Sequence, residues 1–228
     1  MSPDLIALRP YLEDRLATLG LGLSEAQIEG LLLFVASLRH WNQTHNLTAV
    51  RGLPALIETH LLDPLLALPR LSVMDRLGGP WLDVGSGAGV PALPWALALP
   101  GLQIGLVEKV AKKVAFLRHV VPRLGLQDRV EIHATDVQAL QRGASYDMIV
   151  SRAFASLPRF LGLTEHLSRV GTRWIYMAGR LSQVEGLDLK NSMYTHPSLG
   201  PSIVLERIDT LTDPAQKARH LIWLRRDA

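Results

Sequence analysis

The stretch WLDVGSGAGVPALP, residues 81–94, decides the fold because it joins a buried-strand pattern to a glycine-rich turn and a helix start. Its first four residues form a short apolar run. Three glycines then alternate with other residues, at Gly85, Gly87 and Gly89, and a short helical pattern follows at 91–99. A strand, a glycine turn and a helix in this order predict a cofactor-binding turn of an α/β protein. The surrounding residues indicate which cofactor it binds.

Two common glycine loops do not match this stretch. A Walker-type phosphate loop has lysine and then serine or threonine after its last glycine, whereas Gly89 is followed by Val90. The nucleophile elbow of hydrolases has glycines two residues before and after a serine, whereas Ser86 has Val84 and Ala88 at those positions. We therefore expect neither a triphosphate loop nor a serine nucleophile here.

The dinucleotide-binding fingerprint matches only in part. Gly85 and Gly87 occupy its first two glycine positions, but its third position is Val90. The third glycine allows close packing of the helix against the strand, so a β-branched valine there argues against a pyrophosphate at the helix N-terminus.

The remaining pattern, Asp83 followed by G-x-G-x-G, favours the S-adenosylmethionine site of a class I methyltransferase. Glu108 ends the next predicted strand, where an acid can bind both ribose hydroxyls. The glycines let the backbone approach the amino acid end of the cofactor, and Asp83 is expected to meet its ammonium group through water. The simpler alternatives are a turn without a ligand for the glycines and a solvated position for Glu108. The spacing between the glycines and Glu108 favours a cofactor-binding role for both.

The first part of the chain has only helical patterns. Leucines recur at three- and four-residue spacing over residues 5–19. Ser24 and Gln27 form a capping box for a second helix, which is predicted to reach about Trp41.

Prolines predict two further helix starts. One lies at Pro54, and the other lies before the second proline, where Asp63 is expected to be a helix cap. The segment RLGGP, residues 76–80, then marks the boundary between an N-terminal helical cap, 1–78, and a Rossmann-like domain, 79–228.

Beyond this boundary, strand patterns alternate with helical patterns, which indicates a mostly parallel sheet covered by helices on both faces. The predicted fold is α/β and Rossmann-like, with a seven-stranded sheet, a C-terminal antiparallel ribbon and a mobile insertion at 186–201. The predicted strands are 81–84, 102–108, 129–134, 146–150, 173–177, 202–208 and 218–226, and the predicted helices are 91–99, 110–125 and 157–171.

Composition excludes several classes of protein. The 228 residues, 48% of them hydrophobic and 20% charged, are typical of an ordinary folded chain. The absence of cysteine excludes disulfides and cysteine-ligated metals, and the histidines and acids show no metal-ligand spacing. No apolar run approaches the roughly 20 residues of a membrane span, and the first residues lack a signal-peptide layout. We expect a cytoplasmic monomer that binds neither a metal nor a membrane.

Five longer motifs occur along the chain: HWNQTHNLTAVR (40–51), HLLDP (60–64), DVGSGAGVPALP (83–94), KKVAFLRHV (112–120) and YDMIVSRAFASL (146–157). In these motifs and their order the chain resembles the glucose-inhibited division protein B family, over roughly residues 25–225. NLTAVR and SRAFASL are much more specific than the glycine loop. The resemblance implies a bacterial enzyme that transfers a methyl group from S-adenosylmethionine to N7 of a guanine in 16S ribosomal RNA, leaving S-adenosyl-L-homocysteine.

The resemblance also implies roles for particular residues. Those that it places at the cofactor are Gly85, Gly87, Gly89, Val90, Asp136, Val137, Gln138 and Arg152. Residues 136–138 would lie against adenine, and Arg152 would lie at the junction of cofactor and substrate. The chain departs from the family pattern at Ala92, Asp136 and Ala178, where the family usually has glycine, a basic residue and lysine. We therefore expect no lysine contact with RNA at 178, and only a backbone contact of Gln138 with adenine.

Methylation of guanine N7 agrees with the absence of a catalytic triad pattern. N7 carries a lone pair and no proton, so its attack on the sulfonium methyl requires no general base. The enzyme has to hold the nucleophile, the methyl group and the sulfur in line. Because A-form RNA hides N7 in a deep, narrow groove, the guanine is expected to come from a loop or a distorted segment.

Basic and polar residues supply the predicted RNA contacts. The predicted phosphate contacts are Arg51, Lys112, Lys113 and Arg118, supported by a basic isoelectric point. Asn46 and His60 are predicted to contact guanine, and Asn46 and Arg152 are the predicted catalytic residues. The alternatives are a solvated face for the lysines, a turn cap for Asn46 and a core position for His60.

Two other functions stay open on the sequence alone. One is methylation of a small molecule or a protein, and the other is a non-catalytic RNA- or ribosome-binding module that has kept the fold. The first predicts methylation without RNA, and the second predicts no binding of the cofactor.

Overall fold

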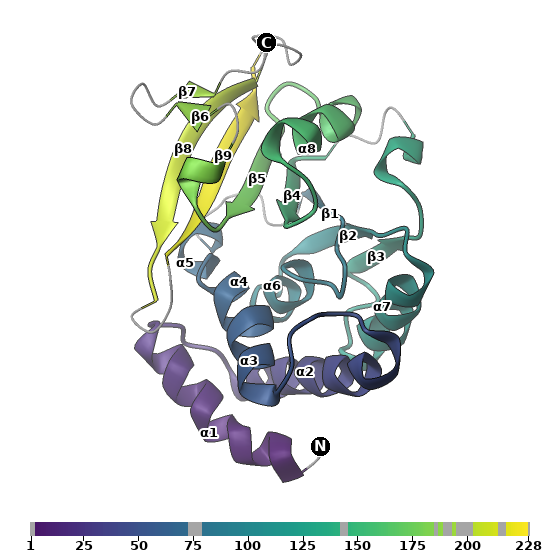
Figure 1. The fold of residues 1–228 in the computed structure, drawn as a ribbon, viewed down its shortest axis with the longest axis vertical. Helices are drawn as coiled ribbons and strands as arrows, with labels where there is room; N and C mark the ends of the chain where they lie inside the picture. The colour runs from purple at the N-terminus through teal and green to yellow at the C-terminus, as the bar shows by residue number, and fades with distance from the viewer. Residues whose placement is uncertain are drawn as a thin grey trace.

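Seven strands form one sheet in the order β3-β2-β1-β4-β5-β9-β8 (Figure 1). The first five strands pair in parallel, whereas β9 is antiparallel to both β5 and β8. The prediction of a mostly parallel, seven-stranded sheet with a C-terminal antiparallel ribbon is thus confirmed. The strands are β1 (Pro80–Val84), β2 (Gln103–Val107), β3 (Val130–His133), β4 (Met148–Arg152), β5 (Arg173–Ala178), β8 (Ile203–Leu211) and β9 (Arg219–Arg226).

The computed structural model describes residues 3–72, 79–141, 146–184, 187–188, 193–194, 203–213 and 218–227. The helices are α1 (Pro3–Thr18), α2 (Glu25–His45), α3 (Leu53–Ile57), α4 (Asp63–Leu65), α5 (Leu68–Leu71), α6 (Ala92–Ala98), α7 (Ala111–Arg123) and α8 (Leu157–Thr164). Shorter turns are the π-helical η1 (Glu58–Leu62) and the 3-10 turns η2 (Val137–Ala139), η3 (Glu165–Leu167) and η4 (Leu181–Gln183). Within the described part, no helix is long and apolar enough to cross a membrane.

The strand order places the glycine turn at the centre of one sheet edge. β1 lies between β2 and β4. β2 and β3 therefore lie on one side of β1, and the later strands lie on the other side. In open α/β sheets, ligands bind at such a reversal, outside the carboxyl ends of the strands. The turn after β1 and the residues after β4 both lie at this position.

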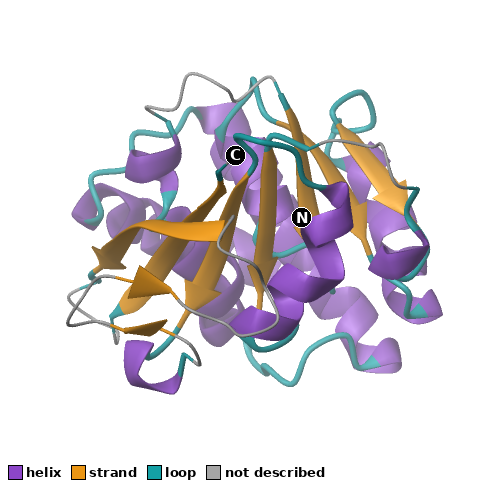
Figure 2. Cartoon of the chain, turned by 90° about the horizontal axis from the view of Figure 1, so that it is seen from above, coloured by secondary structure: helices purple, strands orange, loops and turns teal. Residues whose placement is uncertain are grey.

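Alternate residues of each strand face opposite sides of the sheet. Trp81 and Met148 belong to a core that also contains residues of α1, α2, α6 and α7, whereas Leu82 and Ile149 pack in a second core with α8. Figure 2 shows helices on both sides of the sheet. The N-terminal helices therefore share one core with the sheet. The domain boundary between residues 78 and 79 stays a prediction, since 73–78 lie outside the described residues.

The N-terminal helices follow the predictions with two differences. The capping box of Ser24 and Gln27 is present, but α2 continues past Trp41 to His45 and ends at Asn46, whose φ of 46° is left-handed. The predicted helix 157–171 also leaves α-helical geometry early, since α8 ends at Thr164.

The prediction that Asp63 caps a new helix is wrong. Residues 53–65 form one continuous helical run, in which η1 connects α3 to α4, and Asp63 has helical backbone angles. Pro64 lies inside this run instead of starting a helix. Asp63 is buried and turns its carboxylate toward the sheet.

The prediction of an insertion at 186–201 lies largely outside the described residues. Of this segment the structure describes β6 (Leu187–Asp188) and β7 (Met193–Tyr194), which pair as a short antiparallel ribbon. The sequence patterns did not indicate this ribbon.

Candidate active site

The three positions of the turn are glycine for different local reasons. All have positive φ, of 72°, 60° and 82° at Gly85, Gly87 and Gly89. A Cβ at Gly85 would collide with the ring of Phe154, and a Cβ at Gly89 would collide with Leu93. At Gly87 the nearest side-chain atom would be a lysine Nζ at 4.0 Å. Packing thus requires two of the glycines, and Gly87 is the one whose missing side chain leaves open space for a ligand.

Glu108, which directly follows β2, is hydrogen-bonded to this turn. One carboxylate oxygen accepts a hydrogen bond from Gly87 N at 2.9 Å, and the other accepts one from Val110 N at 2.8 Å. Lys113 Nζ lies 3.9 Å from the first oxygen. The predicted ribose-binding acid therefore lies directly beside the open glycine, and Lys113 lies at the cofactor turn.

Asp83 is a buried carboxylate in the middle of the sheet edge. Neither of its oxygens has a hydrogen-bond partner of normal geometry among the described residues. Burial raises the pKa of Asp83 to about 7, although the Ser86 hydroxyl, the Ala92 amide and Arg152 oppose this shift. A buried acid without a partner requires an explanation. Its contact with the ammonium group of S-adenosylmethionine through water stays a prediction, because both oxygens are buried within the chain.

The predicted adenine-binding residues form the turn η2 after β3. Asp136 caps this turn by accepting a hydrogen bond from Gln138 N at 3.1 Å, and its other oxygen accepts one from Lys109 Nζ at 2.8 Å. The hydrogen bond from Lys109 lowers the pKa of Asp136. Val137 is buried and Gln138 is exposed. The adenine contacts stay predictions.

Arg152 ends β4 on the face of the sheet that the N-terminal helices cover. Its Nη1 donates to the carbonyl of Thr59 at 2.9 Å and lies 3.4 Å from Asp63 Oδ2. Arg219 Nε, from the start of β9, lies 2.6 Å from the other oxygen of Asp63. Burial lowers the pKa of Arg152, and the nearby Asp63 opposes this effect. Asp63 thus bridges two arginines from different strands.

A cavity of about 860 Å³ opens at this bridge, beside the ends of β4 and β5. Its lining includes Asp63, Arg152, Tyr176, Arg180 and Arg219. Among the described residues that line the cavity, Asp63 is the sole acid and three are arginines. The cavity has the size of a small-molecule or nucleobase site and a positive electrostatic character.

The NLTAVR loop packs against the same helical run. Asn46 ends α2, and its side-chain oxygen accepts a hydrogen bond from Arg51 Nη2 at 3.1 Å. Lys112 Nζ, from α7, donates to the backbone carbonyl of Asn46 at 3.3 Å. His60 Nε2 lies 3.1 Å from Thr48 Oγ1. The structure therefore brings together four predicted site residues, and their contacts with RNA or guanine stay predictions.

His60 is buried, and its Nδ1 has no hydrogen-bond partner among the described residues. Burial, and then the charge of Arg152, lower the pKa of His60 to about 4. The imidazole is therefore neutral at neutral pH and offers no charge to a phosphate. Its position favours the core alternative over direct contact with RNA.

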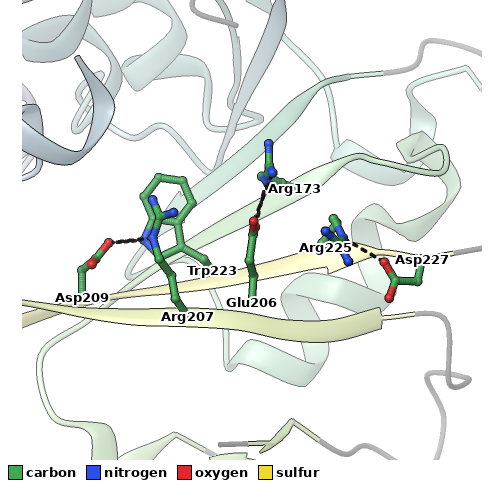
Figure 3. Close-up of polar contacts among 7 residues, drawn as sticks. All are labelled: Arg173, Glu206, Arg207, Asp209, Trp223, Arg225 and Asp227. Atoms are coloured by element: carbon green, nitrogen blue, oxygen red, sulfur yellow. Dashed lines mark hydrogen bonds and ion pairs between the residues drawn. The ribbon is translucent and has the colours of Figure 1, made fainter. Parts of the chain in front are cut away.

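Basic residues differ in whether acids neutralise them. On β5, β8 and β9, the arginines are paired: Arg173 with Glu206, Arg207 with Asp209 and Arg225 with Asp227 (Figure 3). In the part of the chain that the structure describes, neither Lys112 nor Arg51 pairs with a carboxylate, and Arg118 is exposed on α7 without an ion pair. The charges available to a phosphate thus include those on α7 and in the NLTAVR loop.

The site also contains residues that the sequence did not place there: Thr59, Asp63, Tyr176, Arg180 and Arg219. Period-two alternation along β9 would have placed Arg219 on the face of Leu221 and Trp223. No local pattern indicates that Thr59 offers its carbonyl to Arg152.

The sheet, the glycine turn and the orphaned Asp83 beside Glu108 define a class I S-adenosylmethionine-dependent methyltransferase. Solved structures agree with this fold. A mutant of MtNAS in complex with S-adenosylmethionine has a TM-score of 0.56 at 15% identity, covering 98% of this chain and 78% of that one. TrmN from Thermus thermophilus has a TM-score of 0.52 at 21% identity, covering 72% and 48%.

The family model of rRNA small subunit methyltransferase G (GidB) matches residues 27–206. Ribosomal RNA small subunit methyltransferase G of Nitrosospira multiformis is 37% identical, over 94% of this chain and 96% of the relative. The protein of the same name from Pseudomonas syringae pv. tomato is 39% identical, over 92% of each chain. The chain belongs to the rRNA small subunit methyltransferase G family, as the sequence resemblance implied. Its methyl donor is S-adenosylmethionine.

Proposed function

We propose that this chain transfers a methyl group from S-adenosylmethionine to N7 of a guanine in 16S ribosomal RNA, acting as a cytoplasmic monomer. The observation that carries the proposal is the arginine-lined cavity at the ends of β4 and β5. Its lining residue Arg152 ends the strand that pairs with β1, and its charge acts on Asp83. The relatives are named for ribosomal RNA of the small subunit, which supports the substrate class.

When bound, S-adenosylmethionine would supply the methyl group. Asp83 would hold its ammonium group through water, and Glu108 would hold the ribose beside Gly87. The guanine N7 lone pair attacks the methyl carbon as the carbon–sulfur bond breaks, so no proton moves and no general base is required. The chain contributes mainly alignment and exclusion of water.

The cavity offers contacts for a guanine brought out of its helix. Arg152 ends β4 beside the cofactor turn, and a guanidinium donates hydrogen bonds in the plane in which guanine O6 accepts them. Arg51, Lys112 and Arg118 supply charges for flanking phosphates. Asn46, at the start of the NLTAVR loop, accepts from Arg51 with its side-chain oxygen, so its Nδ2 group is the one that would contact the base.

The test is methyl transfer with labelled cofactor and immature small-subunit RNA, followed by nucleoside digestion. We expect the label in 7-methylguanosine. Arg152→Ala should lower kcat/KM by about 100-fold or more, because a misplaced substrate loses the alignment on which transfer depends. Gly87→Asp is the control for cofactor binding, since of the three glycines of the turn Gly87 is the one where a Cβ meets no collision, and the new side chain would occupy the space beside Glu108.

Three outcomes would contradict the proposal. Label in another nucleoside would overturn the N7 assignment. Methylation of a protein or small molecule without RNA would favour the alternative substrates. Failure of the unaltered protein to bind labelled cofactor would favour a non-catalytic module.

A further inference from the structure

The carboxylate of Asp63, in the HLLDP segment of the helical region, contacts residues of the sheet. Asp63 has a side-chain exposure of only 4%, and each of its oxygens faces a different arginine. Arg152 comes from β4 and Arg219 from β9, the two strands on either side of β5. Since β9 is antiparallel to β5, its first residues lie at the carboxyl edge of the parallel strands. One residue of the helical region thus meets both arginines at the substrate edge.

The same turn provides a second anchor for Arg152. In a regular α-helix, the N–H of Asp63 would donate to the carbonyl of Thr59. In η1 it donates to Glu58 instead, one residue further back. The next residue, Pro64, has no N–H to replace it. The carbonyl of Thr59 is therefore available, and it accepts the hydrogen bond of Arg152 Nη1 at 2.9 Å.

The carboxylate of Asp63 lies between two positive charges in the cavity lining. Burial lowers the pKa of Arg152, Asp63 raises it, and the charge of Arg219 lowers it. Among the described lining residues, Asp63 supplies the sole negative charge between the two guanidinium groups. Without it, the two cations would repel each other and lose the ion-pair partner that they share.

We propose that Asp63, assisted by the Thr59 carbonyl, is a positioning residue that holds Arg152 and Arg219 at a fixed spacing in the substrate cavity. It acts through the arginines, with no contact to the reacting atoms. The consequence for methyl transfer rests on the proposed function, whereas the arrangement of the arginines does not.

The first test measures the arginines directly. The full chain is treated with phenylglyoxal, and the modification rate of each arginine is mapped by mass spectrometry. We expect Asp63→Asn to raise the rates at Arg152 and Arg219 by about threefold or more, because both lose an ion-pair partner. The matched control is Asp209→Asn. Asp209 also lies between two arginines, with Arg207 at 3.1 Å (Figure 3) and Arg70 at 3.4 Å. It does not line the cavity.

The second test measures turnover on RNA. Asp63→Asn should lower kcat by about 10- to 100-fold and leave the KM for S-adenosylmethionine nearly unchanged, since only alignment is lost. In an Arg152→Ala background the same substitution should add almost nothing, because both act through one group. Asp63→Glu keeps the charge one carbon further out and should recover part of kcat. Asp209→Asn should retain the kcat of the unaltered protein.

The outcomes separate the two proposals. Inactive unaltered protein would overturn the proposed function, and the phenylglyoxal rates would then decide the positioning role alone. Unchanged rates at Arg152 and Arg219 in Asp63→Asn would overturn that role. So would undiminished kcat in Asp63→Asn, or an equal loss in Asp209→Asn. If Asp63→Asn does not fold, Asp63→Glu decides, and a kcat equal to that of the unaltered protein would overturn the role.

Discussion

At the scale of the residue, Asp83 shows how burial prepares a site for a ligand. It lies at the sheet centre, and no described group hydrogen-bonds its oxygens with normal geometry. In the folded chain its pKa is about 7, against an ordinary value of 3.8. Between these pH values the folded chain holds a proton that the unfolded chain lacks. The contribution of Asp83 to stability therefore falls as pH rises through this window.

Cofactor affinity should show the opposite dependence on pH. The ammonium group of the cofactor favours the ionised carboxylate, so we expect S-adenosylhomocysteine to bind about fivefold more tightly at pH 7 than at pH 6. Asp83→Asn should bind more weakly and with no such dependence on pH. Isothermal titration at the two pH values measures both. Equal affinity of the unaltered protein at pH 6 and pH 7 would show that Asp83 does not meet the ammonium group.

At the scale of the element, Arg129 supports the helix that follows the glycine turn. Its guanidinium donates to the carbonyls of Ala96, Leu99 and Leu102, at 2.9, 3.3 and 3.0 Å. These carbonyls lie at and beyond the C-terminal end of α6, where unpaired acceptors and the helix dipole favour a cation. Arg129, just before β3, thereby holds the C-terminal end of α6. The cofactor turn lies at the N-terminal end of the same helix.

Arg129→Met should lower the free energy of unfolding by about 2–3 kcal/mol, because the carbonyls lose a charged donor. Urea denaturation followed by circular dichroism measures the change. The control is Arg123→Met at the exposed end of α7, where we expect a change within about 0.5 kcal/mol. Equal stability of the two variants would show that Arg129 does not stabilise α6.

At the scale of the whole molecule, the helical region and the sheet form one packed body on one face. Buried residues from Leu12 in α1 to Trp223 in β9 belong to a single core. Arg15 of α1 is also paired with Asp213, which follows β8, and with Glu58 of η1. The polar and apolar contacts both connect the first helix to the last strands.

This shared core predicts one cooperative unfolding transition. Far-UV circular dichroism and tryptophan fluorescence should give the same midpoint, since Trp41 of α2 and Trp174 of β5 lose their surroundings together. Thermal unfolding with both probes measures this. Two separated midpoints would indicate that the helical cap unfolds as an independent domain.

Local patterns were sufficient for much of the fold. Strand alternation, the capping box at Ser24 and the glycine spacing each depend on residues a few positions apart, and the structure contains all three. Local patterns failed at Asp63, where aspartate before proline is typical of a helix start. The π-helical turn continues the helix through Pro64, and tertiary packing turns the acid toward two arginines.

The sequence by itself determined the cofactor class, the sheet and the family motifs, because these depend on spacing along the chain. Only the tertiary structure decided which residues meet at the substrate edge. Arg152 and Thr59 are 93 positions apart, and they meet because the helical run 53–65 packs across the face that Arg152 shares with Arg219. The glycine turn thus identifies the methyl donor, whereas packing across that face assembles the cavity for its acceptor.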